Sequence, residues 1–148
     1  MSAANVAIIA LALIMSGCAA KASGPPDIAV DRTVCSHCGM LVSEPIYAAA
    51  FQAHDSDPRV FDDIGCLLDA ARREPVSPVH IWFQDAASSG WLTAGNAVFV
   101  ASSRIRTPMG GGVLAYASVA AAEKAAALHQ GTVVLSFEEL MKRKGVAR

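Results

Sequence analysis

Two stretches of this chain show the same order of predicted elements, which is strand–strand–helix–strand. The similarity lies in the hydrophobic pattern and not in residue identities. The elements of the first stretch are strands at 46–53, 59–61 and 79–84 around a helix that opens at Asp62-Asp63. Those of the second are strands at 97–101, 113–117 and 132–136 around a helix from Ser118 to about His129. We therefore expect an α+β fold in which two ββαβ units form one small domain.

Both predicted helices carry start and stop signals. Aspartate is a good N-cap and suits the positive end of the helix dipole, so Asp62-Asp63 marks a helix start. In the second helix Ser118 is the predicted cap, and Gly131 is predicted to end the helix at the C′ position. A short strand at 91–93 and a helical turn at 137–141 complete the predicted elements.

The segment Cys35-Ser36-His37-Cys38-Gly39-Met40 carries the strongest chemical signal. Two cysteines three residues apart can face one centre, and Gly39 lets the backbone turn tightly beside them. Redox, zinc and iron–sulfur proteins all use such a pair, so the pair alone is not specific. In an exported protein the alternative is a disulfide between Cys35 and Cys38, either structural or as the metal-free state of a metal site. Met40 narrows the choice, because a thioether is a poor ligand for zinc and a good one for Cu(I). The segment therefore favours a soft-metal site that includes Cys35, Cys38 and Met40.

Further candidate ligands lie outside this segment. Met109 stands in the sequence TPMGGG, a loop in which helical spacing cannot explain it as core filling. We interpret it as a thioether ligand on a glycine-rich loop, with a partly buried anchor as the alternative. His129, at the end of the second helix, is another candidate ligand. Cys66 lies on the apolar side of the first helix and is interpreted as a small buried residue, with metal binding as the alternative.

The N-terminal residues resemble a bacterial lipoprotein signal. The apolar run 5–15 has about the length of a signal-peptide core and is too short to span a bilayer. It leads through small residues to Cys18, and in such signals the cysteine becomes the lipid-bearing N-terminus. The alternative is a secretory signal cleaved near Ala19-Ala20. Residues 1–5 contain no Lys or Arg, although a signal peptide normally begins with positive charge. We expect a signal peptide at 1–17, a tether at 18–30, the metal-binding domain at 31–141 and a basic tail at 142–148.

The charge balance argues against one class of partner. Lys and Arg number 12 against 13 acidic residues, which gives a net charge of −1. A nucleic-acid-binding domain would show a basic stripe, so no nucleic-acid partner is expected. The 4 cysteines are too few for a scaffold held together by disulfides.

Together these motifs resemble the NosL family, the lipoproteins that accompany nitrous oxide reductase assembly. The matching features are Cys35-x-x-Cys38-Gly39-Met40, Phe61-Asp62-Asp63, Trp91 with Ala94, Thr107-Pro108-Met109-Gly110, Cys18 and the segment 131–140. The resemblance covers nearly the whole chain after the signal. It implies a Cu(I)-binding chaperone that is lipid-anchored on the periplasmic side of a bacterial membrane. Such a chaperone would deliver copper for the copper–sulfur centre of nitrous oxide reductase, through an ABC-type assembly complex.

The resemblance also bears on the fold, since related MerB-like domains share the ββαβ architecture. It does not supply the ligands. The set Cys35, Cys38, Met40, Met109 and His129 is inferred from ligand softness and spacing.

Two other classes of function remain open at this point. One is an enzyme, either a thiol–disulfide oxidoreductase that uses Cys35 and Cys38 or an organomercurial-lyase-like thiol enzyme. The other is a structural zinc module, in which Cys35, Cys38, Cys66 and a histidine form a closed ligand set. We expect a binding and transfer protein without turnover.

Overall fold

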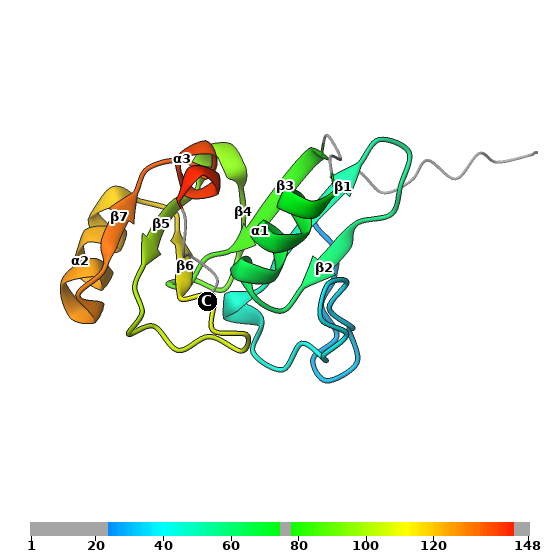
Figure 1. Cartoon of the computed structure of the whole chain (residues 1–148), viewed down its shortest axis with the longest axis horizontal. Helices are drawn as coiled ribbons and strands as arrows, with labels where there is room; N and C mark the ends of the chain where they lie inside the picture. The colour runs from blue at the N-terminus through cyan, green and yellow to red at the C-terminus, as the bar shows by residue number, and fades with distance from the viewer. Residues whose placement is uncertain (1–23, 75–77, 144–148) are drawn as a thin grey trace, which may run out of the picture.

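The computed structural model of the chain describes residues 24–74 and 78–143 (Figure 1). The predicted signal peptide, Cys18, residues 18–23 of the predicted tether and most of the basic tail lie outside the described residues, so these predictions stay untested. Within residues 24–74 and 78–143, no helix has both the length and the apolar character that crossing a bilayer requires.

The first unit builds a sheet of four antiparallel strands in the order β2-β1-β3-β4. Its elements are β1 (Ala49–Ala53), β2 (Arg59–Phe61), α1 (Ile64–Arg73), β3 (Pro78–Gln84) and β4 (Trp91–Thr93). The second unit builds a sheet of three antiparallel strands in the order β6-β5-β7. Its elements are β5 (Val98–Ala101), β6 (Val113–Tyr116), α2 (Val119–His129) and β7 (Thr132–Val134). The helix α3 (Phe137–Lys142) follows, and short 3-10 turns lie at Pro45–Tyr47 and Ala94–Asn96.

The two units have the same topology, which confirms the predicted α+β fold of two ββαβ units. In each sheet the first strand is central, the second strand lies on one side, and the strand after the helix lies on the other. The strand β4 is an addition to the first sheet. A parallel bridge between Asp85 and Ala115 links the two units. The more detailed likeness to MerB stays a prediction.

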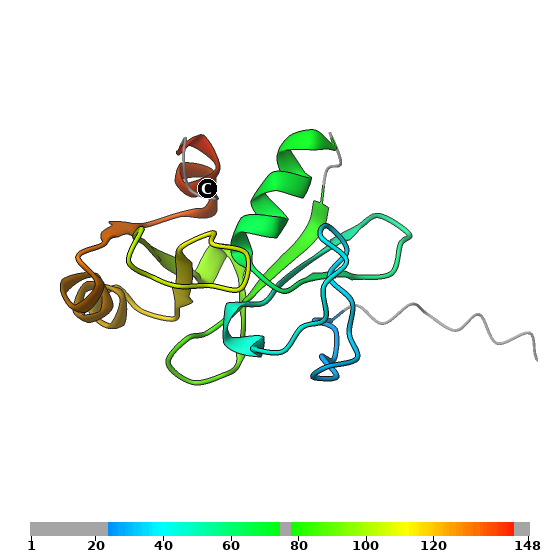
Figure 2. The ribbon, with the colours of Figure 1, turned by 60° about the horizontal axis from the view of Figure 1, so that its bottom comes forward.

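One hydrophobic core joins the two units into a single domain. The rings of Phe83 on β3 and Phe99 on β5 meet edge to face, with centroids 4.8 Å apart. Both side chains are fully buried, as are Leu67 and Leu68 on α1. The helices α1 and α3 lie on the same side of the molecule (Figure 2), while α2 lies at the end away from β1 and β2 (Figure 1). A site at the start of α1 is therefore supported by both sheets.

Several element ends differ from the predictions by one or two residues, among them the end of the strand predicted at 132–136, which stops at Val134; two further differences have a clear physical cause. The strand predicted at 46–53 begins only at Ala49, because Pro45 starts a 3-10 turn that is closed by a hydrogen bond from Ala48 N to the Pro45 carbonyl. The left-handed residue that ends α2 is Gln130, with φ of 50°, and not Gly131. Gly131 is needed for another reason, since a Cβ there would lie 2.8 Å from a methyl group of Val100.

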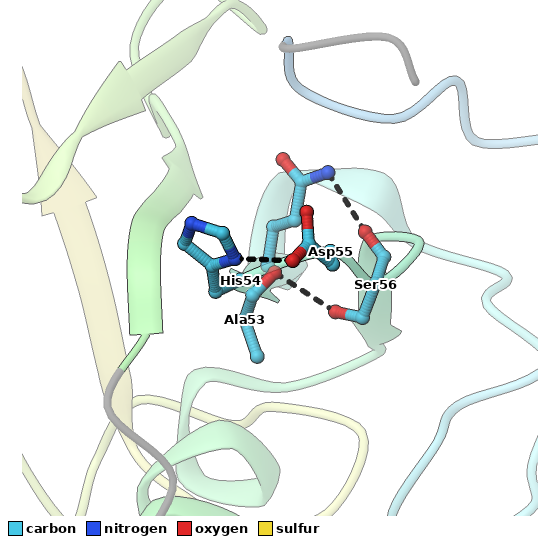
Figure 3. A network of polar contacts seen from close by, with 5 residues as sticks. Ala53, His54, Asp55 and Ser56 are labelled. Atoms are coloured by element: carbon cyan, nitrogen blue, oxygen red, sulfur yellow. Dashed lines mark hydrogen bonds and ion pairs between the residues drawn. The ribbon is translucent and has the colours of Figure 1, made fainter. Parts of the chain in front are cut away.

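The turn between β1 and β2 is held by a small polar network (Figure 3). Ser56 Oγ donates to the carbonyl of Ala53 at 3.0 Å, and Gln52 Nε2 donates to the carbonyl of Ser56 at 2.9 Å. The ring of His54 lies 2.6 Å from the carboxylate of Asp55, and both side chains are exposed. These contacts stay within the turn. The network therefore stabilises the hairpin, and His54 lies at the surface.

Candidate metal centre

Three thiols and one carboxylate meet at the start of α1. The ligand atoms of Cys35, Cys38, Asp62 and Cys66 all lie within 4.8 Å of one another, and we call this group the metal centre. Cys35, Asp62 and Cys66 are 2 to 3% exposed, whereas Cys38 is only partly buried. The centre is therefore closed on most sides and reachable beside Cys38.

Backbone hydrogen bonds fix the Cys-x-x-Cys segment as a tight loop. Cys35 N donates to the carbonyl of Met40 at 2.8 Å, and Gly39 N donates back to the carbonyl of Cys35 at 3.0 Å. Gly39 has φ of +77°, which a residue with a Cβ adopts only with strain. Ser36 N donates to the carbonyl of Val60 at 2.8 Å and ties the loop to β2. The two thiols are thereby set beside the residues that follow β2.

The two adjacent aspartates that follow β2 have different roles, one as a helix cap and one in the metal centre. Asp63 is the N-cap of α1, and its side chain accepts a hydrogen bond from Gly65 N. Asp62 belongs to the metal centre, where Cys38 Sγ donates to its Oδ1 at 3.5 Å. Cys66 stands four residues after Asp62, in the first turn of α1, where the helix dipole favours negative charge. The sequence prediction assigned both acids to the helix start and did not place Asp62 at the centre.

The electrostatics of the centre favour a thiolate at Cys35 with protonated thiols at Cys38 and Cys66. A hydrogen bond from the Cys66 thiol lowers the pKa of Cys35 to about 3, although burial opposes this shift. Donating that hydrogen bond raises the pKa of Cys66. Burial is the main reason that the pKa of Cys38 rises to about 11 and that of Asp62 to about 6. Several anions cannot share this space, but a bound cation would let the other thiols ionise.

A second anchored element lies beside the centre, and we call residues 102–112 the Met109 loop. Asp63 accepts hydrogen bonds through Oδ2 from Thr107 Oγ1 at 2.5 Å, Met109 N at 3.0 Å and Gly111 N at 3.2 Å. A Cβ on Gly111 would lie 2.2 Å from Asp63 Oδ1, so only glycine allows this approach. The loop is thus clamped to the residue next to Asp62, while the side chain of Met109 remains 47% exposed.

The structure brings together some of the predicted ligands and not others. Cys35 and Cys38 share the centre, and Met40 follows them on the same loop with an exposed side chain. Met109 is held near by through Asp63. His129 is not in the group: it ends α2, and its carbonyl accepts from Ser102 Oγ at 2.7 Å. Its role as a ligand stays a prediction without structural support.

Sequence reasoning treated Cys66 as a buried residue first and a ligand second. The structure places its thiol in the metal centre. The signal that could have found it is its position, since Cys66 lies in the first turn of the helix that begins just after Asp62. That signal becomes useful only once Asp62 is known to face the two other cysteines.

These features define the class as a small α+β domain with a thiol-rich centre able to hold a soft metal. The family model of NosL matches residues 27–144, and the chain belongs to the NosL family. The crystal structure of the copper chaperone NosL from Shewanella denitrificans superposes with a TM-score of 0.70, covering 81% of this chain and 100% of that one. At 21% sequence identity, this likeness shows the shared fold. No curated protein sequence matches the chain.

Proposed function

We propose that this protein is a metallochaperone that binds Cu(I) at the metal centre and passes it on without turnover. The observation that carries the proposal is the cluster of three thiols in the metal centre. The centre is reachable beside Cys38, and the Cys-x-x-Cys loop and the Met109 loop each carry an exposed methionine. Thiolates and thioethers are the ligands that Cu(I) prefers. Membership in the NosL family, together with the fold of a protein described as a copper chaperone, supports this reading.

The arrangement suits a metal that must be both protected and released. The buried thiols Cys35 and Cys66 would hold Cu(I) away from water, and the partly exposed Cys38 would be the first to exchange. The metal moves as a cation without a change of oxidation state. Thiols of the acceptor would lose their protons as they bind Cu(I), and the thiolates of the centre would take up protons as it leaves. Thioethers of Met40 and Met109 can join or leave without any proton change.

The destination of the copper is part of the same proposal. We infer, from the family, delivery to an ABC-type complex that assembles the copper–sulfur centre of nitrous oxide reductase. We also infer lipid anchoring through Cys18 on the periplasmic side of a bacterial membrane. Cell fractionation tests the anchor: the wild-type protein is expected in the membrane fraction, released by detergent and not by salt, and Cys18→Ser is expected to be soluble in the periplasm. Wild-type protein found wholly in the soluble fraction would end this part of the proposal.

A structural zinc site is the second candidate, and one observation favours it. The centre offers four ligand atoms, three of them sulfur, and structural zinc takes four ligands. The opening beside Cys38 and the two exposed methionines argue against it, because a structural site is closed and has no use for thioethers.

The third candidate, a thiol–disulfide oxidoreductase, fits the centre less well. A nucleophilic thiol must be both ionised and accessible. The low pKa of Cys35 makes it a thiolate, yet this side chain is only 2% exposed. Cys38 is more accessible, but a pKa near 11 keeps it protonated at neutral pH. Neither thiol meets both conditions.

Metal content after anaerobic purification decides among the three. We expect the full chain to bind stoichiometric Cu(I) and to keep it against excess Zn(II). Cys35→Ser and Cys38→Ser should each weaken Cu(I) binding by orders of magnitude, as measured against a chromophoric Cu(I) chelator. Cys18→Ser is the matched control, since it replaces a cysteine outside the described residues and should leave the affinity unchanged. Tightly held zinc that Cu(I) does not displace would favour the structural site, and metal-free protein that reduces insulin would favour the oxidoreductase.

A further inference from the structure

Among the described residues, two arginines of the Met109 loop have no acidic partner. Arg104 and Arg106 are exposed, and neither guanidinium group forms a hydrogen bond or an ion pair with a described residue. Arg143 differs in this respect, since it pairs with Glu139. On a chain with a net charge of −1, this is a local concentration of unneutralised positive charge.

The two arginines line a broad hollow next to Met109. This hollow, of about 720 Å³, is lined by Ser103, Arg104, Ile105, Arg106, Thr107 and Gly110, and we call it the arginine hollow. Thr107 and Gly110 lie on either side of Met109 in the sequence, so the hollow and the exposed Met109 side chain belong to the same loop. The guanidinium groups of Arg104 and Arg106 give it donors, whereas the Thr107 hydroxyl already donates to Asp63.

The loop that carries the arginines is fixed at three places. Ser102 Oγ accepts from Arg104 N at 3.1 Å and donates to the carbonyl of His129. Ile105, between the two arginines, is 5% exposed and anchors the loop in the core. At the other end Asp63 holds Thr107 and Met109. A loop held in this way presents its charges without a large loss of conformational entropy on binding.

We propose that the arginine hollow recognises a carboxylate-rich segment of the protein that exchanges copper with this chain. The planar guanidinium group matches a carboxylate with two parallel hydrogen bonds, which favours glutamate or aspartate side chains as its occupants. Docking there would bring the partner to the Met109 loop, which is held by Asp63, the residue next in sequence to Asp62 of the metal centre. Attraction between opposite charges would also speed the encounter, and salt would weaken it.

This inference rests on the proposed copper transfer and adds the chemistry of the partner. The concave shape favours a protein segment over a bilayer, because protruding side chains can enter a hollow whereas a flat bilayer surface cannot reach its lining. Anionic lipid is therefore treated as a competing outcome of the test.

The test uses the full chain in detergent, loaded with Cu(I), and two synthetic acceptor peptides. Both peptides contain Cys-x-x-Cys; one also carries a run of glutamates and the other a run of glutamines. We expect copper to pass to the glutamate peptide about tenfold faster at low salt, a difference that shrinks at high salt. The variant Arg104→Gln/Arg106→Gln should lose the difference while its Cu(I) affinity stays at the wild-type value. The control Lys124→Gln/Lys142→Gln removes the same charge from exposed sites on α2 and α3 and should keep the difference.

The outcomes separate the two levels of the proposal. Failure of the wild-type chain to bind Cu(I) would overturn the proposed function, and with it the copper exchange. Normal Cu(I) binding with equal transfer to the two peptides would overturn the arginine hollow alone, as would loss of the difference in the lysine control. Arginine-dependent binding to vesicles of anionic phospholipid, with no preference for the glutamate peptide, would assign the hollow to the membrane and overturn a protein partner.

Discussion

Replacing Asp63 with asparagine tests whether one buried carboxylate holds the Met109 loop beside the metal centre. Asp63 is fully buried, and its two oxygens face different donors. Oδ1 accepts from Gly65 N at 2.6 Å, while Oδ2 accepts from Thr107 Oγ1, Met109 N and Gly111 N. An asparagine has one oxygen and one NH2 group. Whichever way the amide is turned, its nitrogen faces at least one N–H group.

The size of the effect follows from these contacts. A buried donor without an acceptor costs about 1–3 kcal/mol, and the bonds that remain lose the contribution of a charged acceptor. We expect the free energy of unfolding to fall by about 2–4 kcal/mol, a large part of the roughly 5–15 kcal/mol typical of a domain. With an unfolding entropy of about 0.25 kcal/mol/K for a domain of this size, the melting temperature should drop by about 8–16 °C.

Urea unfolding of the metal-free protein measures the loss, and amide hydrogen exchange locates it. The Met109 and Gly111 amides should exchange faster in Asp63→Asn, because their acceptor has changed. Asp69→Asn is the matched control on the same helix. Its ion pair with Arg72, at 3.6 Å, is partly exposed, so its loss should cost less than about 1 kcal/mol. A loss in Asp63→Asn no larger than in the control, or unchanged protection of the two loop amides, would refute the reasoning.

Three further predictions concern the centre itself. Cys66→Ser should keep the fold, since serine is close in size, but weaken Cu(I) binding as the two other thiols do; an unchanged affinity in chelator competition would remove Cys66 from the ligand set. Met109→Leu should alter the free energy of unfolding by less than about 1.5 kcal/mol while weakening Cu(I) binding and slowing transfer, whereas normal transfer would make Met109 a packing residue. The third is a pH effect: because the pKa of Asp62 rises from 3.8 to about 6 on folding, its contribution to stability is present below pH 3.8 and lost as the pH rises through 6. The pKa of Cys35 falls on folding, so its contribution to stability changes with pH in the opposite direction. We therefore compare the urea midpoint of Asp62→Asn with that of the wild type at each pH. The midpoint of the variant minus that of the wild type should grow from pH 4 to pH 6, and a constant difference would contradict the shift in the pKa of Asp62.

Local patterns in the sequence determined most of the fold. The strands at β2 and β4 and the helix caps Asp63 and Ser118 were placed correctly because each depends on residues within one or two turns of chain. The repeated strand–strand–helix–strand order was also predicted correctly, whereas the order of the strands within each sheet came only from the structure. The sequence also identified the Cys-x-x-Cys pair as a candidate metal site, because the geometry of this pair depends only on residues 35–40 and the turn at Gly39. The preference of the site for a soft metal stays a prediction.

Only the tertiary structure decided which distant residues complete the centre. Asp62 and Asp63 are adjacent and chemically identical. Which of them caps α1 and which joins the metal centre depends on the position of the thiols in a loop more than twenty residues earlier. Cys66 has the spacing of a buried helix residue, and its thiol became part of a site because the Cys35 loop pairs with β2. The position of the Met109 loop depends in turn on Asp63, across 44 to 48 residues of sequence. Hydrophobic periodicity specifies which face of an element is buried, but not which other element covers that face. The tertiary packing of the Cys35 loop against β2 and the start of α1 is what brings the residues of the metal centre together.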